Sequence, residues 1–234
     1  MPLIPDYEKF AEKIGVTFED IGLLRQACTH RSYLNEHKKL GLGHNERLEF
    51  LGDAVLELAV TFFLYRKFPN KNEGDLTSYR AAIVNTISLA KIANKLGINE
   101  YLLLSKGEAK DTGRARSIIL ADSVEAVIGA IYLDQGYDSA ANFISEHVLE
   151  VMDIDEIVRK KLWMDPKSRF QETAQDVEGI TPSYKLMKET GPDHNKLFTV
   201  GVYIGTSQIA LGTGMSKQEA EQAAAEKGLE VKGW

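Results

Sequence analysis

The sequence predicts an all-α N-terminal domain followed by a small α+β domain, in which a helix, three strands and a second helix follow one another. Helix-capping residues and terminating glycines recur through the first two thirds of the chain. Near Asp165-Pro166 the pattern changes to short segments separated by turn signals, which is typical of strands. We therefore expect one domain over residues 1–162 and a second over residues 165–234.

The first domain is expected to consist of helices of different lengths. Asp6 can cap a short helix that continues to Ile14 and ends at Gly15. A long helix from Asn45 stops before Pro69, because proline cannot continue a helix. The other expected helices are residues 20–28, 73–96, 117–134, 137–151 and 153–162, and the expected loops are residues 36–44 and 107–116.

The second domain is expected to begin with a helix over residues 167–177. Three strands are predicted after it, at residues 183–190, 197–204 and 207–213, with a tight hairpin turn at Gly205-Thr206. Ser216 is a good cap for a closing helix that runs to about Val231, and Glu219 completes a capping box.

Length and composition set limits on the class of protein. At 234 residues the chain suits one large or two small domains. The single Cys28 excludes an internal disulfide framework and suits a reducing cytoplasm. The N-terminus lacks the apolar run of a secretory signal, and no stretch approaches the length of a transmembrane helix. We expect a cytoplasmic protein without a membrane partner.

The net charge of −6 is unexpected for a protein that binds nucleic acid, because such domains are usually basic. Residues 165–234 contain 8 basic and 10 acidic side chains. Binding to RNA would therefore require a locally basic face, and composition alone argues weakly against it.

Three acidic residues share one face of the helix that begins near Asn45. Glu46, Glu49 and Asp53 are three or four positions apart, and such residues are neighbours on a helix surface. The same face continues with three apolar residues, Leu56, Val60 and Leu64. The carboxylates should therefore point toward the protein. Like charges at this spacing destabilise a helix by roughly 0.2–0.5 kcal/mol, so a cation is expected among them.

A second acidic pair lies in an apolar segment. Between Ile118 and Leu133 the only charged residues are Asp122 and Glu125, which again share a helix face. Four carboxylates on two apolar helices would suit Mg²⁺, which prefers oxygen ligands. The alternative is two ordinary amphipathic helices with acids at their rims, and the choice depends on whether the two helices meet.

Several long motifs resemble the nuclease domain of bacterial ribonuclease III, in the same order and at similar spacing. They are NERLEFLGDA at residues 45–54, NEGDLTSYRA at residues 72–81 and ILADSVEAVIGAIYLD at residues 119–134. THRSY at residues 29–33 and KGE at residues 106–108 also fit. The resemblance implies an all-α nuclease domain. One departure is the alanine that ends the first motif, where the family often has serine.

The C-terminal segment resembles the double-stranded-RNA-binding domain of the same family. The resemblance rests on Gln171 and Gln175 in the first helix, GPDH at residues 191–194, and SKQEAEQAAAE at residues 216–226. The resemblance therefore covers nearly the whole chain. Such domains contact the phosphates and 2′-hydroxyls of an A-form duplex and read its shape.

The residues expected to contact RNA are Gln171, Gln175, His194, Lys196 and Lys217. The alternative is that Lys217 is a solvated surface lysine and His194 an ordinary loop histidine. One departure from the family is Gln218, where a further basic residue is common. We expect this difference to weaken contact with phosphates.

The resemblance also implies a set of site residues in the first domain. The expected metal ligands are Glu49, Asp53, Asp122 and Glu125, of which Asp53 and Glu125 are the expected catalytic pair. The expected cofactor is Mg²⁺, with Mn²⁺ as a possible substitute and no small organic cofactor. Glu46 and Glu73 match accessory acidic positions, although Glu73 would also suit the N-terminus of a helix on electrostatic grounds alone.

The implied activity is hydrolysis of double-stranded RNA to 5′-phosphate and 3′-hydroxyl ends with short 3′ overhangs. The implied roles are maturation of ribosomal RNA precursors and turnover of structured messenger RNA. The family works as a homodimer, and Phe50 matches an interface position. The alternative for Phe50 is packing in the core of its own domain.

Two other functions compete with this one. The first is a binding protein of the same fold that has lost catalysis, which the presence of all four carboxylates disfavours. The second is a metal-dependent hydrolase of small phosphate esters, which the RNA-binding pattern of the C-terminal segment disfavours.

Overall fold

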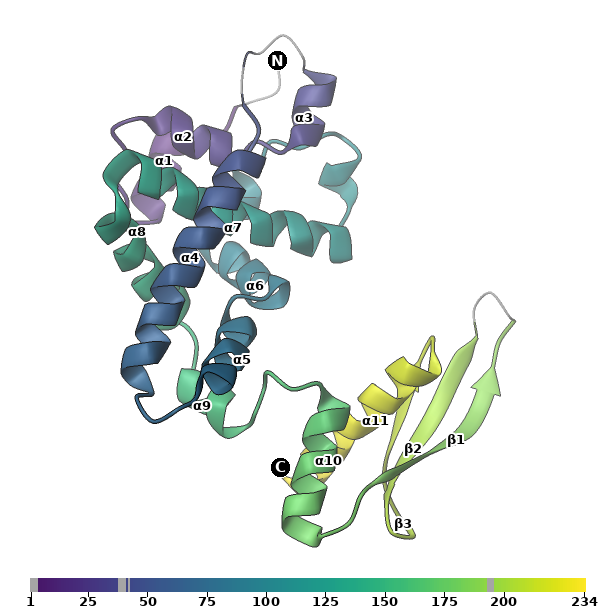
Figure 1. The fold of residues 1–234 in the computed structure, drawn as a ribbon. Coiled ribbons are helices and arrows are strands. Elements are labelled where there is room, and N and C mark those ends of the chain that lie inside the picture. Colours follow the sequence, from purple (N-terminus) through teal and green to yellow (C-terminus); the bar gives the residue numbers. More distant parts are fainter. Residues whose placement is uncertain (1–3, 38–40, 42, 193–195) are drawn as a thin grey trace. The chain divides into compact units, whose positions relative to one another are not determined.

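The computed structural model describes residues 4–37, 41, 43–192 and 196–234. The chain forms two compact units, Met1–Ile154 and Asp155–Trp234 (Figure 1). The first is helical and the second is α+β, so the predicted fold class is confirmed. The division falls N-terminal to the expected limits of 162 and 165. Lys161 Nζ lies 2.9 Å from Glu172 Oε2, which ties the segment before the helix Pro166–Glu178 to the second unit.

The first unit contains two long helices among several short ones. The α-helices up to the division are α1 Tyr7–Lys13, α2 Ile21–Ala27, α3 Arg31–Glu36, α4 Glu46–Lys67, α5 Glu73–Ile83, α6 Thr86–Leu96, α7 Arg114–Gln135 and α8 Tyr137–Ile144, and α9 Ile154–Arg159 spans it. Short turns of 3₁₀-helix occupy Ile98–Glu100 and Glu108–Lys110, and a π-helical turn occupies Ser145–Leu149. The Asp6 side chain caps α1 by accepting from the Lys9 N–H, as predicted.

Two predictions for the first unit were wrong in detail, and one helix was missed. The helix expected over residues 73–96 is two helices, because the Asn85 side chain accepts from the Ser88 N–H and caps α6. Helix α3 was not predicted, and His30 caps it. Residues 107–116 are not all loop, since they include a 3₁₀ turn and the start of α7.

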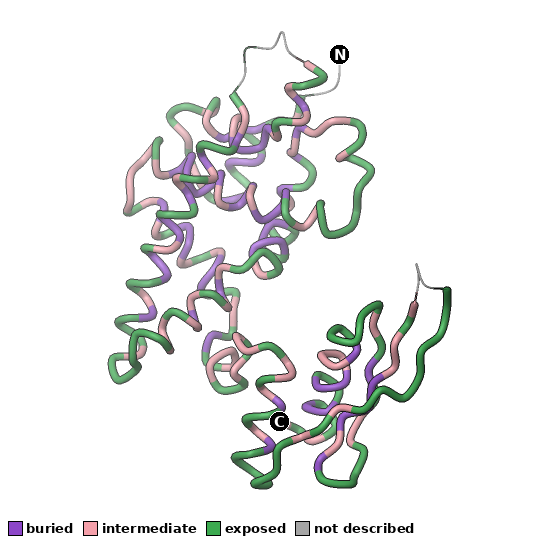
Figure 2. The backbone as a smooth tube through the Cα atoms, turned by 45° about the vertical axis from the view of Figure 1, so that its right-hand side comes forward, coloured by how far each residue is buried: buried purple, intermediate pink, exposed green. Residues whose placement is uncertain are grey.

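Helix α7 runs through the interior of the first unit. It packs against α2, α4, α6 and α8, and it is buried on nearly every side, as expected for a helix that is apolar all round. Buried residues, purple in Figure 2, gather in the interior of this unit. Cys28 is free and fully buried here, and burial raises the pKa of its thiol. No helix in the described part of the chain, α7 included, has the length and apolar composition that a bilayer span requires.

Helices α4 and α7 touch through their backbones. A Cβ atom on Gly52 of α4 would overlap the Glu125 carbonyl oxygen and lie 2.8 Å from the Gly129 nitrogen. A Cβ atom on Gly129 of α7 would overlap the Leu48 carbonyl oxygen. Only glycine fits at either position, so the two helices approach more closely than larger residues would allow.

The second unit is a three-stranded antiparallel sheet with two helices packed on it. The elements are α10 Pro166–Glu178, β1 Ser183–Thr190, β2 Leu197–Ile204, β3 Ser207–Gly214 and α11 Lys217–Lys232, with strand order β1-β2-β3. The predicted strands and turn are confirmed, and Gly205 has φ +59°. The Ser216 side chain caps α11 and Glu219 accepts from the Met215 N–H, close to the capping box that was expected. The core of the second unit joins α10, α11 and β2 through residues that include Phe170, Val202 and Leu229.

The glycine contact between α4 and α7 makes a prediction about stability. Gly129→Ala should lower the thermal unfolding midpoint, because overpacking of this kind costs about 1–3 kcal/mol or more. The matched control is Gly107→Ala, whose new Cβ would meet only Ser105 Oγ at 3.8 Å. Circular dichroism melts of the two variants check this. Equal midpoints for both variants would show that α4 and α7 can move apart without loss of stability.

Candidate active site

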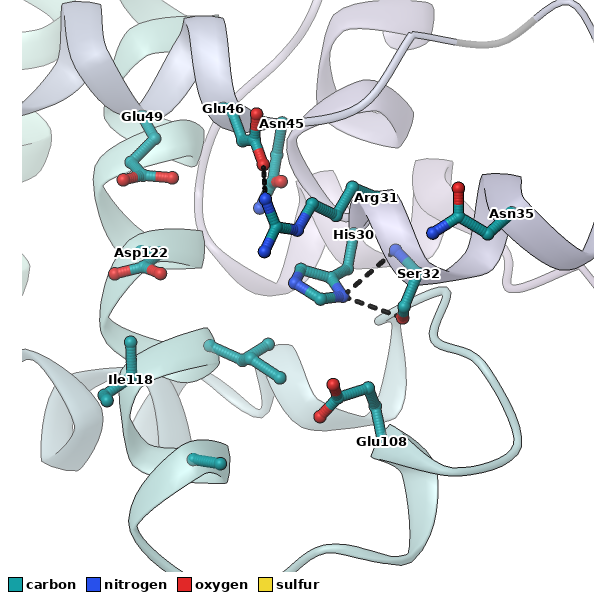
Figure 3. Close-up of a pocket in the computed structure, with 12 residues that line it drawn as sticks. His30, Arg31, Ser32, Asn35, Asn45, Glu46, Glu49, Glu108, Ile118 and Asp122 are labelled. Atoms are coloured by element: carbon teal, nitrogen blue, oxygen red, sulfur yellow. Dashed lines mark hydrogen bonds and ion pairs between the residues drawn. The ribbon is translucent and has the colours of Figure 1, made fainter.

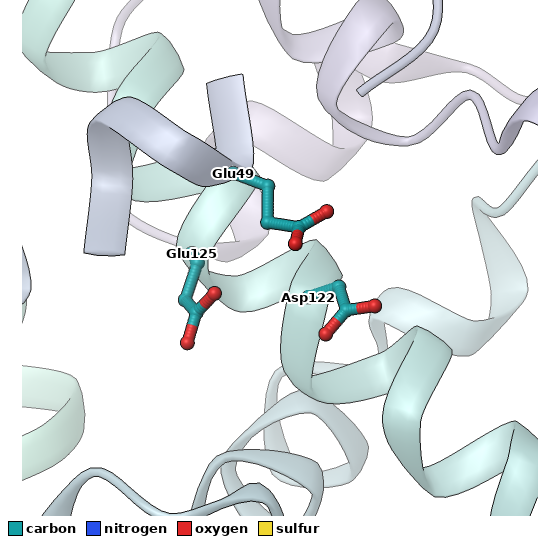
Figure 4. A group of neighbouring side chains, drawn as sticks. All are labelled: Glu49, Asp122 and Glu125. Carbon is teal, nitrogen blue, oxygen red and sulfur yellow. The ribbon is translucent and has the colours of Figure 1, made fainter. Parts of the chain in front are cut away.

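Three carboxylates from two helices converge in the first unit. Glu49 on α4 and Asp122 and Glu125 on α7 each offer an oxygen atom, and these atoms all lie within 4.8 Å of one another (Figure 4). All three side chains are partly buried. The two acidic helices therefore meet, which decides against acids that merely lie at separate helix rims.

The close contact of α4 and α7 brings these acids together. Gly52, which touches the backbone of Glu125, lies one helical turn after Glu49. Further along α4 the predicted apolar face is buried, with Leu56, Val60 and Leu64 all at 1% exposure or less. The prediction that the acidic face turns toward the protein is thus confirmed for Glu49.

Burial and mutual repulsion disfavour the charged form of this cluster. Burial is the main cause that raises the pKa of Glu125 to about 8, and the charges of Asp53, Asp122 and Glu49 add to it. Burial also raises the pKa of Glu49 and of Asp122. Among the described residues, no lysine or arginine forms an ion pair with any of the three carboxylates. Within the described part of the chain, the three carboxylates therefore have no basic side chain paired with them.

The donor set fits a divalent metal ion. Carboxylate oxygens are the ligands that Mg²⁺ and Mn²⁺ prefer, and a bound cation would supply the missing positive charge. Glu49, Asp122 and Glu125 are the residues that can hold it. The position between two packed helices makes the spacing of the donors a property of the fold.

Asp53 does not belong to this close group. Its side chain is exposed, and its influence on the cluster is electrostatic, through the pKa of Glu125 and of Glu49. Glu73 is exposed at the first position of α5, which agrees with the alternative that it only stabilises the N-terminus of a helix. Neither residue lies within the three-carboxylate group, so their metal and accessory roles stay predictions.

A pocket of about 690 Å³ opens beside Glu49 and Asp122 (Figure 3). Its other polar lining residues are His30, Arg31, Ser32, Asn35, Asn45, Glu46 and Glu108. Arg31 Nη1 lies 3.3 Å from Glu46 Oε1, so the exposed Glu46 is paired with an arginine at the pocket wall. Its accessory role stays a prediction. The sequence predicted no individual role for His30, Arg31 or Asn45, although the first two lie in the THRSY motif and Asn45 begins the NERLEFLGDA motif.

The contacts of His30 fit one neutral tautomer. Its Nδ1 accepts from the Ser32 N–H at 3.3 Å and lies 2.8 Å from Ser32 Oγ, an arrangement that suits a neutral ring with its proton on Nε2. Burial lowers the pKa of His30, which favours this neutral form. The ring can therefore donate one hydrogen bond from Nε2 while Nδ1 holds the start of α3.

In the second unit, two of the residues expected to contact RNA lie close together. Lys196, just before β2, and Lys217, at the start of α11, both form ion pairs with Glu189 on β1. Gln171 is exposed on α10, and Gln175 Nε2 donates to Thr181 Oγ1 at 2.9 Å. His194 lies outside the described residues. The RNA-contact roles of all five stay predictions.

Phe50 lies on the surface of α4. Its side chain is 81% exposed, so the alternative that it packs in the core of its own unit is wrong. Leu58, Phe62 and Tyr65 are also more than half exposed on the same helix. They continue from Phe50 at steps of three or four through the exposed Ala54, which places them along one face.

Comparison with known protein families places both parts of the chain. Residues 20–152 match the family model described as ribonuclease-III-like, and residues 166–232 match the double-stranded RNA binding motif. The chain belongs to the ribonuclease III family. Ribonuclease 3 of Enterococcus faecalis is 47% identical over 93% of this chain and 94% of its own length. Ribonuclease 3 of Geobacillus thermodenitrificans is 47% identical over 96% of this chain and 90% of its own length.

A solved structure of the family resembles the first unit. The ribonuclease III nuclease domain of Campylobacter jejuni, which has a region involved in dimer formation, is 41% identical with a TM-score of 0.56. The match covers 62% of this chain and 97% of that domain. As a ribonuclease III family member with a double-stranded-RNA-binding domain, the protein is an endoribonuclease, which decides against a hydrolase of small phosphate esters.

The crowded carboxylates make a prediction about stability without metal. The folded-state pKa of Glu125, about 8, exceeds its ordinary value of 4.5, so the metal-free protein should lose stability as pH rises between these values. Glu125→Gln removes this loss. In a chelator, the variant should therefore melt above the wild type by about 2–4 °C at pH 8, and the difference should shrink toward pH 5.

Calorimetry with and without Mg²⁺ provides the check. Added Mg²⁺ should raise the melting temperature of the wild type and leave that of Glu125→Gln nearly unchanged, since only the wild type keeps all three carboxylates and their negative charge. A variant that is less stable than the wild type at pH 8 in chelator would contradict the charge crowding.

Proposed function

We propose that the protein is a divalent-metal-dependent endoribonuclease that cleaves double-stranded RNA to 5′-phosphate and 3′-hydroxyl ends with short 3′ overhangs. The observation that carries the proposal is the group of Glu49, Asp122 and Glu125, which meets beside a pocket and has no cationic partner among the described residues. Membership of the ribonuclease III family supports the choice of substrate.

Glu49, Asp122 and Glu125 would hold the metal ion, and Asp53 is the predicted fourth ligand. We expect Mg²⁺, with Mn²⁺ as a substitute. When bound, such an ion lowers the pKa of a water molecule and offsets negative charge at a phosphate. The carboxylates themselves act by position, because each must be ionised to hold the cation. Asp53 and Glu125 are the residues that we assign to catalysis.

The pocket wall can orient the RNA strand. The Arg31 guanidinium is exposed and bound only loosely to Glu46, so a phosphate can replace that carboxylate as its partner. The Nε2–H of His30 is a further donor for a phosphate or hydroxyl oxygen. Glu46 would then steer Arg31, which gives the accessory acid a positional role.

A homodimer would explain how both strands of a duplex are cut. The exposed apolar face of α4, formed by Phe50, Leu58, Phe62 and Tyr65, is a surface that a second copy of the chain could cover. One active site in each subunit, acting on one strand each, would leave staggered ends. The second unit would add affinity by reading the A-form shape of the duplex.

The roles that fit this activity are maturation of ribosomal RNA precursors and turnover of structured messenger RNA in the cytoplasm. The family resemblance supports these roles.

Loss of Glu125 should separate cleavage from binding. We expect Glu125→Gln to reduce cleavage of a perfect RNA duplex by at least 100-fold, because the negative charge of one metal ligand is lost, while duplex affinity measured in chelator stays unchanged. Glu57→Gln makes the same charge change on α4 instead of α7. Glu57 pairs with Arg80 and is not one of the three converging carboxylates, so this variant should keep most activity.

The assay uses duplex RNA with Mg²⁺, beside single-stranded RNA and duplex DNA. Turnover of Glu125→Gln near the wild-type level would remove Glu125 from the metal site. A wild-type protein that binds the duplex but never cuts it would favour the binding-only alternative.

A charge on the apolar face of α4 should disrupt the dimer. Phe62→Glu places a carboxylate within reach of Arg66, whose guanidinium carbon now lies 5.5 Å from the Phe62 ring centroid, so the helix itself should tolerate the change. Sedimentation velocity of the full chain should show a dimer for the wild type and a monomer for the variant. Val231→Glu, at an exposed apolar residue of the second unit, should stay dimeric. A monomeric wild type at micromolar concentration would contradict the two-strand mechanism.

A further inference from the structure

We propose that Glu189 limits the affinity of the second unit for duplex RNA, because its carboxylate competes with RNA phosphates for Lys196 and Lys217. The inference rests on the proposed function, which assigns both lysines to RNA contact. It adds a residue that acts against binding and that no family motif singled out.

A single carboxylate bridges two lysines from different elements. Glu189 Oε2 lies 3.5 Å from Lys196 Nζ, and Glu189 Oε1 lies 3.8 Å from Lys217 Nζ. Glu189 is near the end of β1, Lys196 directly precedes β2, and Lys217 is the first residue of α11. The fold therefore brings both cations to one acidic side chain, and each oxygen faces a different lysine.

The pairs are open to solvent and can exchange. The Lys217 side chain is 61% exposed, and those of Glu189 and Lys196 are about one third exposed. Exposed ion pairs of this kind are weak, so a phosphate that approaches the lysines can displace the carboxylate. When a phosphate takes the place of the carboxylate, the Glu189 side chain must turn away or remain close to a second negative charge. Either outcome makes the free energy of RNA binding less favourable.

Lys217 has a second contact that does not depend on Glu189. Its Nζ lies 5.9 Å from the centroid of the Phe198 ring, and Phe198 stands opposite Glu189 in the β1–β2 ladder. Ser216 also fixes the start of α11 by accepting from the Glu219 N–H. Removal of the Glu189 charge should thus leave Lys217 in place and available to a phosphate. We therefore expect the affinity for RNA to rise.

The charge balance makes this one carboxylate important. Residues 165–234 carry more acidic than basic side chains, so RNA binding depends on where the cations gather. Among the described residues, Glu189, Lys196 and Lys217 together carry a net charge of +1, and Glu189→Gln would raise it to +2. A change of one charge beside a phosphate alters affinity and its salt dependence.

The same helix offers a matched control. Lys232, the last residue of α11, forms an ion pair with Glu178 of α10, whereas Lys217 is the first residue of α11. Glu178→Gln changes the net charge of the unit by the same amount as Glu189→Gln, but at the opposite end of a 16-residue helix. A general effect of net charge would appear in both variants, and a local effect only in Glu189→Gln.

The experiment measures affinity of the full chain for a labelled RNA duplex by fluorescence anisotropy, in chelator so that no cleavage occurs. The proteins are the wild type, Glu189→Gln, Lys217→Gln, the double variant and Glu178→Gln, each at several salt concentrations. Glu189→Gln should bind about three- to fivefold more tightly at low salt, and the gain should fade as salt screens the charges. The gain should be smaller when Lys217 is already replaced, and Glu178→Gln should match the wild type.

The outcomes separate this inference from the proposed function. If Lys217→Gln binds as tightly as the wild type, the assigned RNA-binding face is wrong. If Lys217→Gln binds more weakly but Glu189→Gln shows no gain, only the role of Glu189 is wrong. An equal gain in RNA affinity in Glu178→Gln would also contradict the role of Glu189. Circular dichroism melts show whether each variant is folded. Glu189→Thr, a second neutral variant with a residue suited to a strand, should show the same gain in affinity if the loss of charge is the cause.

Discussion

Backbone contact between α4 and α7 sets the distance between the acidic side chains of the nuclease unit. Gly52 and Gly129 leave room for the carbonyl groups of Glu125 and Leu48 to pass beside the opposite helix. Glu49 and Glu125 project from the two helices next to this crossing, so their carboxylates meet although their repulsion opposes it. The apolar burial along both helices supplies the stability that holds like charges together. A metal ion would then bind to a site that already has its shape.

The sequence was informative where a local pattern decides the structure. The spacing of acids on α4 and α7 identified the three carboxylates that meet, and turn and capping residues predicted the sheet of the second unit. The meeting itself depends on contacts between residues far apart in the chain, which spacing cannot predict. Asp53 illustrates this limit, because it shares a face with Glu49 by helix arithmetic yet is exposed outside the close group. The break at Asn85 was missed because residues 73–96 look helical throughout and the cap is one side chain.

The second unit shows why overall charge is a poor guide to RNA binding. Its acidic composition argued against a nucleic-acid partner, yet the fold places Lys196 and Lys217 at one corner. Family membership assigns double-stranded RNA as the partner. The ion pairs of Lys196 and Lys217 with Glu189 bear on how strongly these lysines can attract phosphate. Glu178 and Glu221 engage Lys232 and Lys167 in the same unit, so several of its cations already have acidic partners.

The buried thiol of Cys28 has a practical consequence. The chain has one cysteine, its side chain is fully enclosed in the helical unit, and burial raises its pKa. A thiol-specific reagent should therefore react only when that unit opens, and the rate of labelling would report its unfolding directly. Any cysteine introduced on the surface would be the one accessible attachment point for a dye, without removal of a native residue.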